Sequence, residues 1–311
     1  MQSSSDDRKR AVALTSLTAA VALTLFKIAV GWLTGSLGIL AEAAHSGLDL
    51  VAAAATYFAV RTAARPPDTE HRYGHGKVEN LSALFETALL LGTCVWIVYA
   101  AVDRLLHGGA EVEITIWSFA VMITSIVIDW SRSRALYKVA RETNSQALEA
   151  DALHFETDIW SSSVVIAGLL CVQASRWFPA ASWLRHGDAL AALAVAGIAS
   201  IVTIRLGMRT IHALMDAAPA DMEARIVRAA ESVPGVLDCH NLRFRYSGST
   251  LFVDAHVTMD GSITLAAAHD IADQVESAVR NELPGADITV HAEPSTQPSQ
   301  ESGGNTPFVR D

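Results

Sequence analysis

Residues 37–60 read LGILAEAAHSGLDLVAAAATYFAV, an apolar stretch that nevertheless contains Glu42, His45 and Asp49. About 20 mostly apolar residues are enough to cross a bilayer as a helix. Ionisable side chains inside such a helix are costly, so each of them is a candidate functional residue. His45 and Asp49 stand four residues apart, which places both on one helical face. The stretch predicts a membrane helix that presents an imidazole and a carboxylate together.

The same spacing occurs again in a later apolar stretch, residues 152–173, where His154 is followed by Asp158. Two helices that each offer one histidine and one aspartate can surround a cation with four ligands. Nitrogen and anionic oxygen in a tetrahedral arrangement suit Zn²⁺, and other divalent transition metals are possible. Two unrelated polar pairs at helix contacts are the alternative, which the repetition of the pair disfavours.

Six segments are predicted to span the membrane within a domain of residues 11–210, preceded by an N-terminal segment, residues 1–10. They are residues 11–33, 37–60, 79–102, 115–130, 152–173 and 188–208. The run 115–130 is short and is included because an even number of spans keeps the loop charges consistent. Thirteen lysines and arginines fall on one side and three on the other. This bias predicts that both termini of the multi-pass protein lie in the cytoplasm, and we expect the protein in the cell (inner) membrane.

Composition agrees with a membrane protein. The chain has 311 residues, of which 51% are hydrophobic and 18% are charged, whereas soluble domains carry about 25% charged residues. This composition argues against an ordinary cytosolic enzyme, a disordered chain and a nucleic-acid-binding protein. The three cysteines are too few and too scattered for a disulfide framework or a thiolate metal cluster.

A polar domain follows the apolar one. From residue 214 onward there are 15 acidic residues and 6 arginines, whereas the first 213 residues are nearly balanced at 18 acidic and 17 basic. The pattern predicts a separate cytoplasmic domain over residues 211–294 whose acidic surface is compatible with cations. The Pro-, Ser-, Gln- and Gly-rich composition that follows predicts a disordered tail over residues 295–311. Within the domain we expect a helix at 220–232, strands at 236–247 and 250–259, a helix at 263–283 and a strand at 286–292. This order suits a small α+β domain with helices on one face.

Three motifs together resemble a known family. They are LAEAAHSGLD at residues 40–49, HRYGHGKVE at 71–79 and ALHFETD at 152–158. Over residues 10–294 the chain is similar to the cation diffusion facilitators, most of all to their bacterial zinc and ferrous-iron efflux branch. The resemblance implies six membrane helices followed by a ferredoxin-like α-β-β-α-β cytoplasmic domain. It also implies a homodimer that exports divalent metal in exchange for protons, without a prosthetic group and without enzymatic activity.

The resemblance assigns the transport site to His45, Asp49, His154 and Asp158. Many bacterial relatives have aspartate at the first of these positions, so histidine there favours Zn²⁺ over iron as the main substrate. Cd²⁺, Fe²⁺, Co²⁺ and Mn²⁺ are possible alternatives.

Two further metal sites are expected. The spacing D-x-x-H-x-x-x-H brings Asp68, His71 and His75 together in a short loop that binds zinc in relatives, although a solvated polar loop is the alternative. The tail residues that the resemblance assigns to a structural or regulatory two-metal site are His240, His256, His269, His291 and Glu293. Relatives usually have aspartate as the last of these ligands. The resemblance also assigns Lys77 and Asp216 to a salt bridge that interlocks the dimer.

Two other functions are compatible with the same residues. In a membrane-bound metal sensor or scaffold, the tail would bind metal without transport. In an integral-membrane zinc hydrolase, Glu42 is the nearby acid that could act as the general base. Metal flux across a sealed membrane separates a transporter from both, since only a transporter moves the ion.

Overall fold

The chain folds into two compact units. The computed structural model describes residues 2–35, 37–107, 116–177, 187–217 and 222–295. The first unit comprises residues 1–216 together with the turn at 246–249, and the second comprises residues 217–245 and 250–311. Residues 296–311, which hold nearly all of the predicted disordered tail, lie outside the described residues.

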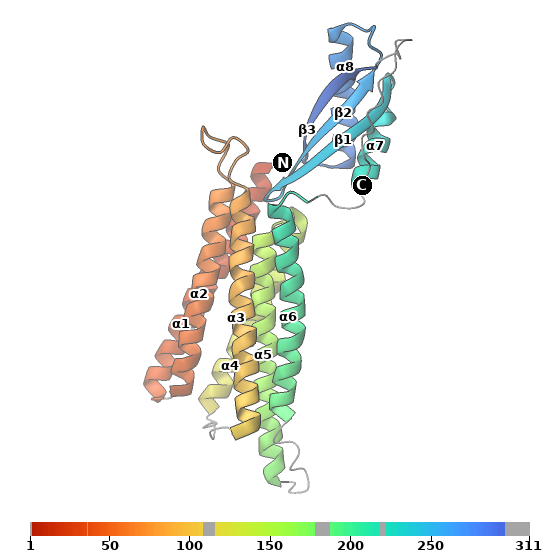
Figure 1. The fold of residues 1–311 in the computed structure, drawn as a ribbon. Coiled ribbons are helices and arrows are strands. Elements are labelled where there is room, and N and C mark those ends of the chain that lie inside the picture. The colour runs from red at the N-terminus through yellow and green to blue at the C-terminus, as the bar shows by residue number, and fades with distance from the viewer. Residues whose placement is uncertain (1, 36, 108–115, 178–186, 218–221, 296–311) are drawn as a thin grey trace. The chain divides into compact units, whose positions relative to one another are not determined.

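Long helices build the described part of the first unit (Figure 1). They are α1 (Gln2–Thr34), α2 (Leu37–Ala63), α3 (Lys77–His107), α4 (Ile116–Thr143), α5 (Gln146–Trp177) and α6 (Gly187–Leu214). Five of them contain a predicted span whole, and α4 contains the described part, residues 116–130, of the span predicted at 115–130. Helix α1 already begins at Gln2, so the described part of the segment 1–10 is helical and continuous with the first span. Helix α4 runs to Thr143, well beyond residue 130, and its second half contributes Leu136, Val139 and Ala140 to a buried cluster with α5.

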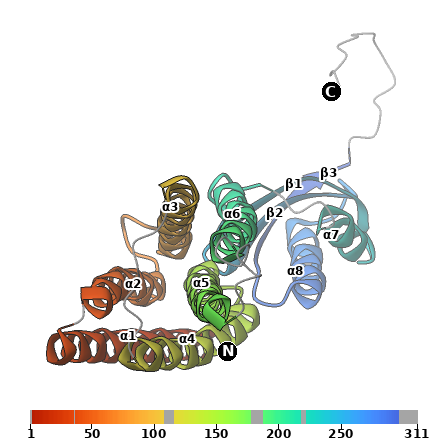
Figure 2. The same cartoon turned by 90° about the horizontal axis from the view of Figure 1, so that it is seen from below.

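Helix α5 lies at the centre of this unit, as the view along the helices shows (Figure 2). One of its faces contributes Ala152 and Phe155 to a buried cluster with residues of α1, α2 and α4. Another face contributes Ala150 and Leu153 to a cluster with α3 and α6. Small residues let neighbouring helices approach closely in a membrane protein. The packing therefore fixes the position of α5, which carries two of the candidate ligands.

Within the described residues, three helical segments are long and apolar enough to cross a membrane by length and composition. They are Ser5–Thr34, Lys77–Asp103 and Leu193–Leu214, in α1, α3 and α6. The other long helices carry more polar groups. Helix α5, for example, has four acidic residues within its first half, at positions 149, 151, 156 and 158.

The second unit is a small sheet with two helices. In chain order it contains α7 (Met222–Glu231), β1 (Val236–Ser247), β2 (Thr250–Met259), α8 (Leu265–Glu282) and β3 (Asp287–Pro294). The predicted order of elements is confirmed, and the predicted bounds of the first two strands match the observed ones. The sheet order is β1-β2-β3, with β2 and β3 parallel. The ferredoxin-like assignment goes further than this three-stranded sheet and stays a prediction.

The two faces of this sheet differ. Along β2 the side chains alternate, with Leu251, Val253 and Val257 buried and the residues between them partly exposed. The buried face packs against α7 and α8, which cover the same side of the sheet (Figure 2). The opposite face is not covered by either helix and carries His256 at the middle of β2. Alternation thus places a histidine on the open face of the sheet.

Candidate metal centres

Four predicted ligands meet between α2 and α5, and we call them the helix tetrad: His45, Asp49, His154 and Asp158. The Nε2 atom of His154 lies 3.1 Å from Asp49 Oδ1 and 3.5 Å from Asp158 Oδ2. The Nε2 atom of His45 lies 3.9 Å from Asp158 Oδ1 and 4.0 Å from Asp49 Oδ1. Each helix therefore contributes both ligands of its His-x-x-x-Asp pair to one small volume, as the helical spacing predicts.

The tetrad is closed on one side and open on the other. The His154 side chain is 5% exposed, whereas the His45 side chain is 41% exposed. Asp49 and Asp158 are largely buried between these extremes. Buried carboxylates need a compensating cation or hydrogen-bond donors. The geometry can hold a divalent ion, with His45 as the ligand on the accessible side.

A buried lysine lies beside the tetrad. Lys27 of α1 places its Nζ atom 2.7 Å from Ser46 Oγ and 3.4 Å from Glu42 Oε2, both on α2. In the sequence Lys27 stands within the apolar stretch 11–33. The structure shows that its partner is Ser46. Ser46 directly follows the tetrad residue His45 in the sequence. Lys27 therefore neutralises one of the acidic groups near the tetrad and fixes α1 against α2.

The loop between α2 and α3 brings together the loop triad, Asp68, His71 and His75. Asp68 Oδ1 lies 3.4 Å from His71 Nδ1, and Asp68 Oδ2 lies 3.3 Å from His75 Nε2. Asp68 also accepts backbone N–H bonds from His71 at 2.6 Å and Glu70 at 3.0 Å. These bonds, that from His71 first, lower the pKa of Asp68 below its ordinary value. The carboxylate is thus held ionised next to two imidazoles.

The second unit brings together the sheet cluster, formed by His240, His256, His291 and Glu293. Glu293 on β3 is central, because its Oε1 atom lies 2.7 Å from His256 Nδ1 and 3.8 Å from His291 Nε2. Its other oxygen, Oε2, lies 3.3 Å from His240 Nε2. The strand register pairs His256 with His291. All four residues lie on the helix-free face of the sheet.

An irregularity in β1 places His240 on that face. Asn241 has a positive φ of 50°, which is uncommon except for asparagine and similar residues. Cys239 and Phe244 are both buried although an even number of residues separates them, so the alternation shifts by one position here. The Asn241 amide also donates to His256 Nε2 at 3.1 Å. Sequence reasoning missed this residue, whose only signal is the tolerance of asparagine for this conformation.

With Asn241 donating to Nε2, the proton of His256 is on Nδ1, where it is donated to Glu293. This hydrogen bond is the main reason that the pKa of Glu293 is lowered, and the neighbouring imidazoles add to the shift. The longer arm of glutamate, in place of the usual aspartate, thus still reaches the histidines of all three strands.

The fifth predicted tail ligand, His269, is not brought into this cluster within one chain. It lies on α8, on the helix-covered side of the sheet, and its side chain is 74% exposed. Its imidazole lies 4.0 Å from Asp273 on the same helix. Within one chain, therefore, four of the five predicted tail ligands lie together, and His269 lies apart from them.

The predicted pairing of Lys77 with Asp216 is present within one chain. Lys77 Nζ donates to Asp216 Oδ1 at 3.0 Å, and both side chains are partly exposed. The pair connects the start of α3 to the residues that follow α6. Its role at a dimer interface stays a prediction.

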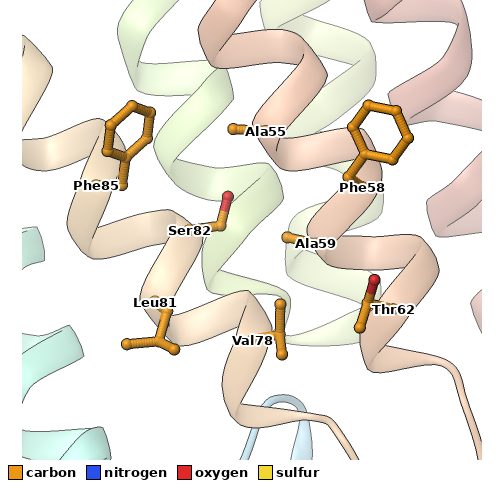
Figure 3. Close-up of a pocket in the computed structure, with 8 residues that line it drawn as sticks. All are labelled: Ala55, Phe58, Ala59, Thr62, Val78, Leu81, Ser82 and Phe85. Carbon is orange, nitrogen blue, oxygen red and sulfur yellow. The ribbon is translucent and has the colours of Figure 1, made fainter.

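A groove of about 330 Å³ lies between α2 and α3 (Figure 3). Phe58 and Phe85 are among its eight lining residues, and the only polar side chains in the lining are Thr62 and Ser82. None of the candidate metal ligands lines it. The groove suits an apolar group rather than a cation.

Comparisons with known proteins identify relatives of this chain. Residues 13–215 match the model of the cation efflux transmembrane domain, and residues 218–295 match that of the cation efflux protein cytoplasmic domain. The chain is 34% identical over 293 residues to the cation-efflux pump FieF of Yersinia enterocolitica, covering 92% of this chain and 93% of that protein. It is 33% identical over 305 residues to FieF of Pectobacterium atrosepticum, covering 94% and 97%. It is also similar to a solved cadmium form of the MamM CTD at 34% identity and a TM-score of 0.24, covering 24% of this chain and 96% of that one.

Proposed function

The chain belongs to the cation efflux family, the cation diffusion facilitators, and from this premise we propose that it exports Zn²⁺ from the cytoplasm in exchange for protons. Members of the family are divalent metal transporters rather than enzymes, so the hydrolase alternative is set aside. The observation that carries the proposal is the helix tetrad. Two imidazoles and two carboxylates converge between helices of the membrane domain.

Zinc is the substrate that this ligand set favours. Zn²⁺ accepts four ligands in a tetrahedral arrangement and binds imidazole nitrogen and carboxylate oxygen well. Harder ions such as Mn²⁺ prefer a larger number of oxygen ligands. Two nitrogens among four ligands therefore support Zn²⁺ over Mn²⁺, with Cd²⁺, Fe²⁺ and Co²⁺ as further substrates.

Proton exchange follows from the chemistry of the ligands. A histidine binds metal only when its ligating nitrogen is unprotonated, and an aspartate only when it is ionised, so bound metal and bound protons exclude one another. In the exporter, metal entering from the cytoplasm displaces protons from the tetrad. Protons entering from the opposite side displace the metal there. Alternating exposure of one central site by rocking helices, as in other secondary transporters, completes the cycle.

The membrane arrangement is part of the same proposal. Six helices cross the inner membrane, and both termini lie in the cytoplasm because lysines and arginines gather on that side. The three helices with more polar residues are included because their ionisable groups face the bundle interior. His154, Asp129 and Arg132 are all buried there. Large apolar side chains such as Trp32, Trp96 and Leu33 point outward, where lipid would surround them.

The second unit is proposed to be a cytoplasmic metal-binding domain in a homodimer. Its sheet cluster supplies ligands on an open face, and the loop triad supplies a further metal site. Zn²⁺ at these positions would stabilise or regulate the transporter rather than be transported. Lys77 and Asp216 are proposed to hold the dimer together where they meet.

Metal flux through the reconstituted full chain tests the function. Sealed proteoliposomes that contain an encapsulated zinc indicator should take up Zn²⁺, and the rate should increase when the interior is made more acidic than the exterior. Proton efflux should accompany uptake. Absence of Zn²⁺ movement would exclude a transporter of zinc and favour the sensor. A rate of Zn²⁺ uptake that does not depend on the pH gradient would exclude proton exchange.

A further inference from the structure

The two helices of the tetrad repeat more than the His-x-x-x-Asp spacing. Residues 42–49 read EAAHSGLD and residues 151–158 read DALHFETD, so an acidic residue also stands three positions before each histidine. Residues three apart on a helix are neighbours on one face. Each histidine therefore has a second carboxylate beside it, one turn closer to the start of its helix.

On α2 this second carboxylate is already paired. Glu42 is half exposed, and its Oε2 atom lies 3.4 Å from the buried ammonium of Lys27. Lys27 also donates to Ser46 Oγ. The charge of Glu42 is therefore neutralised by Lys27.

On α5 the equivalent carboxylate, Asp151, is fully buried, and only one of its two oxygens has a hydrogen-bond partner within the described residues. Ser16 of α1 donates its hydroxyl to Asp151 Oδ2 at 3.2 Å. Ser16 Oγ in turn accepts from Arg132 of α4, at 3.2 Å and 3.4 Å from two guanidinium nitrogens. Because these bonds occupy the lone pairs of Ser16, its single proton is committed to Asp151. Asp151 Oδ1 has no hydrogen-bond partner within the described residues.

His154, three residues further along α5, also has a ring nitrogen without a hydrogen-bond partner in the described part of the chain. His154 turns Nε2 toward Asp49 and Asp158, while its Nδ1 atom is buried and has no partner among the residues that the structure describes. If Nε2 is to offer a lone pair to a metal, the proton of the neutral ring must be on Nδ1. A buried N–H group without an acceptor is costly. An unused donor and an unused acceptor therefore lie one helical turn apart, and the two groups interact electrostatically.

We propose that Asp151 is a positioning residue for His154, accepting its Nδ1–H through a bridging water and so holding the Nε2 lone pair toward the metal. This inference rests on the proposed function of the tetrad. Histidines that bind metals commonly donate their other N–H to a carboxylate, a carbonyl or a water, which fixes the tautomer and the ring orientation. A water that joins buried polar groups is a normal part of protein interiors. Arg132 donates to Ser16, and the bond from Ser16 holds Asp151 in place for this role.

The substitution Asp151→Asn tests the proposal because the side chain keeps nearly the same volume while one acceptor oxygen is replaced by an NH₂ donor. Ser16 must still donate, so the amide oxygen of asparagine faces Ser16 and its NH₂ group faces His154. The bridging water would then donate to Nδ1, which places the ring proton on Nε2 and blocks the metal. Asp151→Glu retains a carboxylate and should restore much of the binding.

The measurement is equilibrium Zn²⁺ binding to the purified full chain in detergent. The background carries His71→Ala, His75→Ala, His256→Ala and His291→Ala, so that the helix tetrad dominates binding. In this background we expect D151N to weaken Zn²⁺ binding roughly 10–100-fold, the usual cost of losing the partner of a metal ligand. In a background that also carries His154→Ala, D151N should change the affinity less than about twofold, since the two residues act as one unit.

Glu86→Gln is the matched control. Glu86 is also fully buried, also has an oxygen without a partner in the described part of the chain, and accepts from Thr56, but it lies on α3. The substitution E86Q should have the same effect on Zn²⁺ binding in the background with His154 and in the background with His154→Ala. An equal loss from D151N in both backgrounds, or no loss in either, would overturn the proposal. If D151N does not fold, failure of a folded D151E to bind more tightly than D151A would overturn it as well.

Failure of the proposed function is distinguished by Asp158→Ala. If D158A leaves Zn²⁺ binding unchanged, the helix tetrad itself is not the metal site. If D158A abolishes binding while D151N is neutral, the tetrad stands and only the positioning role of Asp151 is wrong.

Discussion

The helix tetrad and the sheet cluster use the same kinds of ligand in opposite surroundings. Both combine imidazole nitrogens with carboxylate oxygens at distances of about 3–4 Å. Three of the four tetrad side chains are 5–15% exposed and His45 is 41% exposed, whereas the four cluster side chains are 28–66% exposed. The ligand types alone therefore do not separate a transport site from a binding site, but the burial does.

Burial decides what happens when the metal leaves. Ionised carboxylates that are withdrawn from water are costly unless a cation or hydrogen-bond donors compensate them. Under the proposed antiport, an emptied tetrad would gain protons, and metal release would be coupled to proton uptake. An emptied sheet cluster is hydrated, so its metal can leave without that exchange. The difference predicts that the tetrad sets the transport rate and that the cluster modulates it.

The largest expected effect is the loss of transport on removing a tetrad carboxylate. Asp49→Ala or Asp158→Ala should reduce Zn²⁺ flux in proteoliposomes to background. The loss should exceed the roughly 10–100-fold that removing a mere partner of a ligand costs, because an anionic ligand itself is lost. The protein should remain folded and should still bind Zn²⁺ at the sheet cluster, which serves as the internal control.

Zinc flux at the wild-type rate in either variant would contradict the assignment of the tetrad. Loss of flux together with loss of Zn²⁺ at the sheet cluster would show general misfolding instead. Zinc stoichiometry and size-exclusion chromatography of the same preparations separate these outcomes.

A smaller effect is expected from changing one tetrad ligand in kind. His45→Asp replaces a nitrogen ligand by a harder oxygen ligand on the accessible side of the site. The Zn²⁺/Cd²⁺ flux ratio should then change by up to about tenfold, the effect of roughly 1.4 kcal/mol. His256→Asp in the sheet cluster is the control and should leave the ratio unchanged. A constant ratio in the His45 variant would mean that selectivity is set elsewhere.

Removing the sheet cluster should have a weaker effect on transport. His256→Ala combined with His291→Ala should lower Zn²⁺ binding by a full chain in which Asp49 and Asp158 are also replaced by alanine. Free Zn²⁺ at 100 times the Kd of a site stabilises the fold by about 2.7 kcal/mol. The variant should lose the corresponding rise in melting temperature on addition of Zn²⁺. With the tetrad intact, transport should fall but persist. Equal Zn²⁺ binding with and without the two histidines would make them ordinary surface residues.

The sequence was sufficient to predict these two regions where a short repeat determines the geometry. Helical spacing places His45 beside Asp49 and His154 beside Asp158, and strand alternation places His256 on one face of β2. The elements of the second unit were predictable for the same reason. Local periodicity determines which face a residue occupies, and it does so before any tertiary contact is known.

Contacts between distant segments could not be predicted in this way. The pairing of Lys27 with Ser46, and of Ser16 with Asp151, depends on how α1 packs against α2 and α5. The shift in β1 depends on the backbone conformation of Asn241. His269 was grouped with the sheet cluster by resemblance, but the helix that carries it lies on the other side of the sheet. Periodicity gives no information on any of these.

The smallest expected effect on transport concerns the loop triad, which is as exposed as the sheet cluster. Asp68→Asn keeps an oxygen that can accept the backbone N–H groups of Glu70 and His71 but removes the negative charge. Zinc bound at the loop should decrease, as measured by metal stoichiometry against His71→Ala. Zinc flux should change less than about twofold, because exposed charges contribute little and the tetrad is intact. A flux as low as that of Asp49→Ala would place the loop triad in the transport path.

The pH dependence of this loop gives the last test. Backbone N–H bonds lower the pKa of Asp68 in the folded loop, so their contribution is present above the ordinary aspartate pKa of about 3.9 and is lost as the pH falls through the lowered folded value. Hydrogen exchange of the His71 and Glu70 amides should therefore show unchanged protection, after correction for the intrinsic rate, from pH 7 down to about pH 4. Bound Zn²⁺ should be lost earlier on acidification, because protons compete directly for the histidine nitrogens. If amide protection and Zn²⁺ are lost together, the metal and not the Asp68 carboxylate orders the loop.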